Sequence, residues 1–175
     1  PLNDAKDERA GVYLTNALTG WEPPKEPKTL LLFPEMAEER DAADRIKRRD
    51  SILVILGNPP YDGFAGVAVT AEERALSDAY RTTRLAPPPQ GQGLNDPYIR
   101  FFRMAERRIV ETNQPQKGVI CFISNNAWLD NLSCPGMRER YLEVFDRIGS
   151  DNLHGDKYKT GKLTPEGDPD PSAFS

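Results

Sequence analysis

The stretch SILVILGNPPYDGF, residues 51–64, decides the fold and also points to a site. An apolar run over residues 52–56 ends at Gly57 and then meets Asn58-Pro59-Pro60-Tyr61. β-Branched residues and leucine without polar alternation are typical of a parallel strand that is covered on both faces. Each proline fixes its own φ and restricts the residue before it, so the chain leaves the strand in a stiff loop. The stretch therefore predicts a buried strand that is followed by a rigid polar and aromatic loop.

The rest of the sequence alternates between strand patterns and helix patterns. Thr70 with Glu73 forms a capping box, and Asp96 followed by Pro97 is typical of a helix start. Strands are expected at residues 11–18 and 117–124, and helices at residues 35–49, 70–84, 96–109 and 137–148. This alternation predicts an α/β fold with a mostly parallel sheet flanked by helices.

The composition is that of a globular chain. Its 175 residues are 38% hydrophobic and 29% charged, with a net charge of −4. We expect no signal peptide and no membrane partner, because no apolar run approaches the roughly 20 residues of a membrane span. The acidic balance disfavours a uniformly basic nucleic-acid binder, although a local basic stripe can still supply phosphate contacts.

The two cysteines match no zinc or redox spacing, so no metal site is expected. Cys121 lies in an apolar run and is predicted to be a core thiol. Cysteine usage of this kind fits a cytoplasmic setting.

Polar and aromatic residues follow each predicted strand. In open parallel sheets, ligands bind beyond the carboxyl ends of the strands. Asn58-Pro59-Pro60-Tyr61 follows one strand, the segment SNNAW at residues 124–128 follows another, and Asn16 stands at the end of the first. These three places are therefore expected to be neighbours.

The residue types of Asn58-Pro59-Pro60-Tyr61 suit methyl transfer to a planar amine. Adenine N6 is a poor nucleophile because its lone pair is delocalised into the ring. The side-chain oxygen of Asn58 and the backbone carbonyl of Pro59 can accept its two hydrogens and expose that lone pair. Tyr61 can stack on a base that has been extruded from the duplex. The alternative interpretation is a simple turn after a strand, since Asn-Pro is a common turn dipeptide.

The chain resembles the amino-methyltransferases, and specifically the adenine-N6 DNA methyltransferases of restriction-modification systems. Asn58-Pro59-Pro60-Tyr61 matches the catalytic motif of that family, and GVICFISNNAWLD resembles the strand and turn that follow it. LTNAL resembles the segment whose polar residue, Asn16 here, contacts the cofactor adenine. The resemblance is closest to the type I-like single-polypeptide and type IIG enzymes, which join a methylase to a nuclease.

This resemblance implies an S-adenosyl-L-methionine cofactor, catalytic roles for the four motif residues, and duplex DNA with a flipped adenine as the substrate. The glycine-rich cofactor motif of the family, its acidic ribose-binding residue and a later aromatic-bearing strand have no counterpart here. We therefore expect an incomplete Rossmann-like methyltransferase fold, with residues 1–150 as its catalytic part and residues 151–175 as a poorly ordered polar tail.

An incomplete domain implies weak or absent cofactor binding by this chain alone. Its expected partner is the remainder of a parent polypeptide, namely an upstream cofactor-binding half and downstream target-recognition and nuclease or helicase regions. Two alternatives stay open. One is methylation of protein glutamine or RNA by enzymes that share Asn-Pro-Pro-Tyr, and the other is a non-catalytic remnant of the fold.

Other side chains have less specific patterns. Lys157, Lys159 and Lys162 are the candidates for contacts with the DNA backbone, and His154 lies either beside them on phosphate or in a solvated loop. Trp128 lines either the site or the core. Tyr98 and Phe101 are expected in the core, and a solvated helix face is expected for Arg100, Arg103, Arg107 and Arg108.

Overall fold

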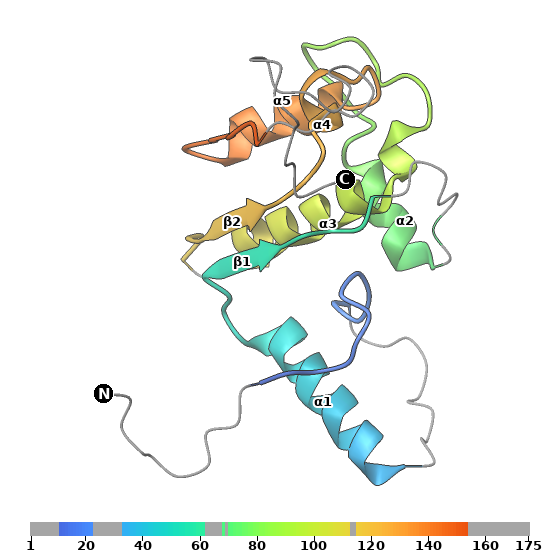
Figure 1. Cartoon of the computed structure of the whole chain (residues 1–175), viewed down its shortest axis with the longest axis vertical. Coiled ribbons are helices and arrows are strands. Elements are labelled where there is room, and N and C mark those ends of the chain that lie inside the picture. The colour runs from blue at the N-terminus through green and yellow to red at the C-terminus, as the bar shows by residue number, and fades with distance from the viewer. Residues whose placement is uncertain (1–10, 23–32, 62–67, 69, 113–114, 154–175) are drawn as a thin grey trace, which may run out of the picture. The chain divides into compact units, whose positions relative to one another are not determined.

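The structure, a computed structural model, describes residues 11–22, 33–61, 68, 70–112 and 115–153. The chain divides into two units, Pro1–Val144 and Phe145–Ser175. The described part of the first unit holds five α-helices and a two-stranded parallel sheet (Figure 1), which confirms the mixed α/β class. In the second unit, residues 145–153 form neither helix nor strand. The rest of the predicted polar tail lies outside the described residues.

The sheet pairs β1 (Val54–Gly57) with β2 (Val119–Phe122) in parallel. Val54 lies opposite Val119, and Gly57 lies opposite Phe122. The prediction that these two apolar runs form neighbouring parallel strands is confirmed. Gly57 lets the ring of Phe122 approach closely at the end of β1, since a Cβ atom there would lie 3.0 Å from this ring.

The two faces of this sheet differ. On one face, Phe102 of α3 packs on Phe122 with ring centroids 5.1 Å apart. On the other face, the side chain of Leu56 is 71% exposed, and its cross-strand neighbour Cys121 is exposed as well. The prediction of a strand covered on both faces is therefore wrong, and so is the prediction that Cys121 is a core thiol. The buried thiol is Cys134.

Two of the helices, α2 and α3, begin where local capping chemistry predicts. The hydroxyl of Thr70 accepts a hydrogen bond from the backbone N–H of Glu73 at 3.1 Å, and the carboxylate of Asp96 accepts one from Tyr98 at 3.3 Å. The helices are α1 (Pro34–Arg49), α2 (Ala71–Asp78), α3 (Pro97–Glu106), α4 (Ala127–Asp130) and α5 (Pro135–Val144). A 3₁₀ turn over Gly93–Asn95 precedes α3, and a π-helical segment over Arg107–Thr112 follows it. α2 and α5 both end before the predicted residues 84 and 148.

The predicted strand over residues 11–18 is absent, because this segment satisfies its backbone differently. Residues 11–16 have no regular structure. The N–H of Leu14 donates to the carboxylate of Glu39, and the N–H of Leu18 donates to the side-chain oxygen of Asn16. Side chains thus replace the ladder that a neighbouring strand would have supplied.

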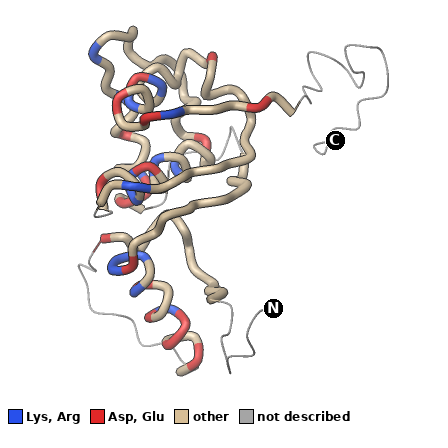
Figure 2. Tube along the Cα trace, turned by 90° about the vertical axis from the view of Figure 1, so that its left-hand side faces the viewer, with Lys and Arg blue, Asp and Glu red and all other residues tan. Residues whose placement is uncertain are grey.

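The core lies among α2, α3 and α5. Tyr80, Leu94, Ile99 and Met137 are among the largest fully buried side chains. α5 approaches the chain after α2 so closely that a Cβ atom on Gly136 would lie 2.1 Å from the carbonyl oxygen of Tyr80. Figure 2 shows that charged residues gather on the helices, whereas the traces of β1 and β2 carry none.

Among the described residues, no helix is long and apolar enough to cross a membrane.

Candidate functional site

The predicted catalytic motif forms the loop directly after β1. Asn58 follows Gly57, the last residue of the strand. Pro59 is buried, whereas Asn58 and Pro60 are exposed. The side chain of Tyr61 is 40% exposed. The buried proline anchors the loop while its amide and aromatic side chains remain accessible to a ligand.

The hydroxyl of Tyr61 ties the ends of the two strands together. It lies 2.7 Å from the side-chain oxygen of Asn58 and 2.8 Å from the carbonyl oxygen of Ile123, just after β2. A phenol carries a single hydrogen, so it donates to one of these two acceptors at a time. The N–H of Ile123 also donates to the carbonyl of Gly57 at 3.0 Å, which continues the ladder past the strands. The prediction that the ends of the two strands are neighbours is confirmed.

The ring of Tyr61 is supported from the helical side. Tyr98, at the start of α3, meets it edge-on with ring centroids 6.2 Å apart. Tyr98 is buried and continues into the aromatic core through Phe102, as predicted for a core residue. A phenol is protonated at neutral pH, and burial raises the pKa of Tyr61 further. The ring is thus held in place while part of it stays open to solvent.

The loop offers acceptor oxygens rather than a strong base. An amide oxygen has two lone pairs, so Asn58 can accept a hydrogen bond from a ligand besides the one from Tyr61. The backbone carbonyl of Pro59 is a second acceptor in the same loop. Within the part of the chain that the structure describes, no group of three or more His, Cys, Asp or Glu side chains could hold a metal ion.

The segment after β2 divides between the loop and the core. The side-chain oxygen of Asn125 accepts from the N–H of Ala127 at 3.1 Å at the start of α4. The ring of Trp128 packs against Phe102 and Tyr141, at centroid distances of 5.8 and 6.1 Å. Of the two interpretations of Trp128, the structure favours packing in the core.

Asn16 lies among helix contacts rather than at a strand end. Its side-chain amide donates to the carboxylate of Glu73 in α2 at 3.0 Å. Its backbone carbonyl accepts from the ammonium of Lys47 in α1 at 2.6 Å. The predicted placement is wrong because no strand forms over residues 11–16. The cofactor role of Asn16 stays a prediction.

The sequence also predicts a set of DNA-binding lysines and a set of solvated arginines. The nucleic-acid candidates Lys157, Lys159 and Lys162 lie outside the described residues, as does His154. The prediction of a solvated face is wrong for three of the four arginines, since the buried residues of this helix include Arg100, Arg103 and Arg108.

The signal that could have revealed these buried arginines is the apolar pattern of the same helix. Apolar side chains occupy most positions around it, including Ile99, Phe101, Phe102 and Ile109. Such a helix is covered on more than one side, so the stems of its arginines become buried with it.

Comparisons with known proteins give no family for the chain. A scan against models of protein families, a search of curated proteins and a search of solved structures each found no match.

Proposed function

We propose that this chain carries the catalytic loop of an S-adenosylmethionine-dependent methyltransferase that acts on adenine N6 in duplex DNA. The observation that carries the proposal is the position of Asn58-Pro59-Pro60-Tyr61. The loop is exposed at the carboxyl end of a parallel strand and is tied to the neighbouring strand end by the hydroxyl of Tyr61. This is the edge of a parallel α/β sheet at which ligands bind.

Each residue of the loop has a definite task in this chemistry. The side-chain oxygen of Asn58 and the carbonyl of Pro59 accept the two hydrogens of the target amine and localise its lone pair. The ring of Tyr61, backed by Tyr98, stacks on the extruded base. The buried Pro59 and its neighbour Pro60 limit the movement of the loop, so the acceptors are positioned before the base arrives.

S-Adenosylmethionine would supply the methyl group, and the residue proposed to hold its adenine does not lie beside the loop. Asn16, the candidate for the cofactor adenine, bonds instead to Glu73 and Lys47. We therefore propose that segments other than the loop and Asn16 hold the cofactor.

The open sheet supports the same conclusion. Parallel sheets are normally covered on both faces, and a two-stranded sheet has little stability of its own. Here one face exposes Val54, Leu56 and Val119. We therefore place this chain within a longer polypeptide whose other segments extend the sheet and complete the cofactor pocket.

The experiment that tests the proposed function uses that parent polypeptide. It is incubated with methyl-labelled S-adenosylmethionine and, separately, with adenine-containing duplex DNA, duplex DNA without adenine, RNA and a protein extract. We expect label only in the adenine-containing duplex, as N6-methyladenine after nuclease digestion. Label in RNA or in protein glutamine would select the alternative methylase, and the absence of label from all substrates would identify a non-catalytic remnant.

A matched pair of variants connects that activity to the loop. Asn58→Ala removes the amide acceptor, whereas Gln92→Ala removes an exposed amide outside the loop. Only Asn58→Ala should slow labelling, by about 10²–10³-fold. Isothermal titration of the present chain with S-adenosylmethionine should show weak or undetectable binding, and tight stoichiometric binding would contradict the incomplete pocket.

A further inference from the structure

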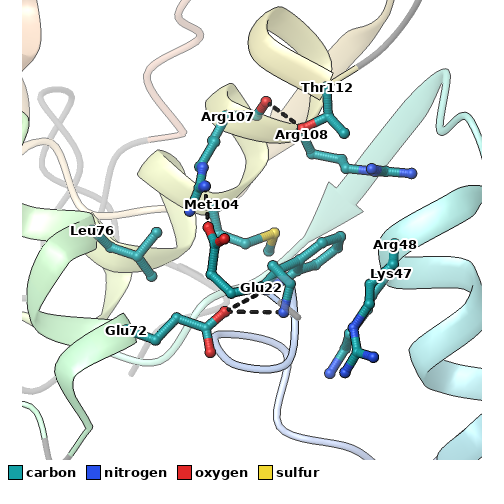
Figure 3. A pocket seen from close by; sticks show the side chains of 10 residues that line it. Glu22, Lys47, Arg48, Glu72, Leu76, Met104, Arg107, Arg108 and Thr112 are labelled. Atoms are coloured by element: carbon teal, nitrogen blue, oxygen red, sulfur yellow. Dashed lines mark hydrogen bonds and ion pairs between the residues drawn. The ribbon is translucent and has the colours of Figure 1, made fainter. Parts of the chain in front are cut away.

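Charged side chains surround a small cavity, and no residue of the loop after β1 lines it. The cavity has a volume of about 140 Å³ and lies between the turn that carries Trp21, helices α1 and α2, and the π-helical segment after α3 (Figure 3). Its lining is rich in charge and includes Glu22, Lys47, Arg48, Glu72, Arg107 and Arg108.

Arg108 is buried, but its guanidinium group makes few hydrogen bonds. Its side chain extends towards α1 (Figure 3), and the residue is only 3% exposed. Its Nε has no hydrogen-bond partner among the described residues. Its Nη2 makes one long contact, 3.5 Å to the carbonyl of Ile46. A buried donor without an acceptor costs free energy, so this guanidinium is suited to an additional acceptor.

Lys47 is a second buried cation on the same cavity. It is 7% exposed, and its ammonium donates to three neutral oxygens, those of Thr15, Asn16 and Thr19, at 2.6–2.9 Å. Lys47 and Arg108 both contact the ring of Trp21, at 6.0 and 5.5 Å from its centroid. Burial lowers the pKa of both groups, which shows that their positive charges are held at a cost.

The acids around the cavity are already engaged. The carboxylate of Glu72 accepts the backbone N–H groups of Gly20, Trp21 and Glu22. Glu22 pairs with Arg107, and Asp44 pairs with Arg48. Asp44, Glu72 and Asp50 act on the two buried cations through space. Within the described residues, neither Lys47 nor Arg108 forms a salt bridge, so no carboxylate is bonded directly to either cation, although these three acids offset part of their charge through space.

The π-helical segment positions the two arginines differently. Arg107 turns towards Glu22, whereas Arg108 extends towards α1 (Figure 3). The hydroxyl of Thr112 donates to the carbonyl of Arg107 at 3.2 Å within this widened turn. Such segments are rare and occur frequently at functional sites.

We propose that this cavity binds a single phosphate group, either free or carried as a monoester by a larger molecule. A phosphate can accept from Nε and Nη of Arg108 together, since these donors of a guanidinium point in nearly the same direction. Its double negative charge matches the two buried cations. The cavity of about 140 Å³ is smaller than the 300–1,000 Å³ of pockets that enclose a drug-sized ligand, so only the phosphate itself enters. This binding is independent of the proposed methyl transfer.

The test compares the thermal unfolding and the titration calorimetry of the full chain in inorganic phosphate and in chloride at equal ionic strength. Phosphate should bind saturably and raise the unfolding temperature by linkage. Arg108→Gln, which keeps a polar side chain but removes the charged fork, should weaken binding by about 10-fold to 100-fold. Arg108→Lys should retain part of the affinity. Arg49→Ala removes an exposed arginine from α1 and should bind as the wild type does.

The general stabilising action of phosphate on proteins is present in every variant, so the informative quantity is the difference between the wild type and Arg108→Gln. Equal stabilisation of the two, or no saturable binding to the wild type, would overturn the proposal. The wild-type titration decides the matter even if Arg108→Gln does not fold. A parallel titration with adenosine monophosphate and adenosine separates the two sources: stronger binding of the monophosphate with none of adenosine assigns a monoester, and equal binding of the two phosphates assigns the free anion.

Discussion

Helix α2 packs against α3, and α5 packs on α3 and on the chain after α2, whereas the strand ends and the loop after β1 are open. Ile99 and Met137 of the helices are fully buried. Leu56 of β1 and Tyr61 of the loop expose 71% and 40% of their surfaces. The comparison indicates that the helices provide most of the stability of this chain. The strands serve mainly to position a loop whose function depends on being accessible.

The strongest test of the helical layer is the buried carboxylate of Glu106. It accepts hydrogen bonds from the hydroxyl of Tyr80 and the guanidinium of Arg103, both at 2.7 Å, and pairs with Arg140. Glu106→Ala leaves these donors without their acceptor and should lower the free energy of unfolding by about 3–5 kcal/mol. Urea unfolding followed by circular dichroism measures this. The control is Glu38→Ala at an exposed position, which should change the free energy of unfolding by no more than about 0.5 kcal/mol. Equal losses in the two variants would show that the buried carboxylate does not stabilise the helices.

The comparison is sharpest between two apolar side chains of similar size. Ile99→Ala removes a fully buried group of α3 and should cost about 2–5 kcal/mol of unfolding free energy. Leu56→Ala removes an exposed group from the open face of the sheet and should change it by no more than about 0.5 kcal/mol. A comparable loss for Leu56→Ala would mean that this face is covered in solution.

Close backbone approach in the helical layer gives a smaller effect. Gly136→Ala places a methyl group against the carbonyl of Tyr80 and should cost about 1–3 kcal/mol through displacement of α5. Gly149→Ala is the control, because nothing lies within 4 Å of its added Cβ atom. Thermal unfolding of the two variants compares them directly. Equal stability would show that α5 does not pack as described.

The reactivity of the two thiols compares the two regions in the wild-type chain. Cys121 is exposed on the open sheet face, whereas burial raises the pKa of Cys134 to about 11. Thiol reagents attack the thiolate. At about pH 8, Cys121 should therefore react rapidly, whereas Cys134 should react only after unfolding. Cys121→Ser, a substitution at the exposed position, should remove the rapid phase and so assigns both phases. Rapid labelling of Cys134 in the folded chain would contradict a closed helical layer.

Local chemistry in the sequence predicts much of this fold. Thr70 and Asp96 mark helix starts through their own side chains, and two charge-free apolar runs mark the paired strands. The position of the Asn58-Pro59-Pro60-Tyr61 loop follows from the strand before it. These features depend on residues a few positions apart, which a single sequence displays.

Features that depend on distant partners were not predictable. The segment over residues 11–18 resembles a strand by composition, yet Glu39 of another element satisfies the N–H of Leu14. The apolar pattern of its helix indicates that Arg108 is covered, but it does not show that the covering groups are Trp21 and Ile46. Hydrophobic periodicity predicts that charged residues lie on an exposed face, and it contains no information on contacts between residues far apart in the sequence.

The most direct test of the proposed chemistry is Asn58→Ala in the parent polypeptide. The side chain is exposed, so unfolding free energy should change by no more than about 0.5 kcal/mol. Single-turnover methyl transfer to an adenine-containing duplex should slow by about 10²–10³-fold, because the lost acceptor acts on the amine as it attacks. Base extrusion, reported by the fluorescence of 2-aminopurine, should remain, and Tyr61→Phe should keep much of the activity because stacking needs the ring. Methyl transfer by Asn58→Ala at the parent rate would contradict the mechanism and leave the loop as a structural turn.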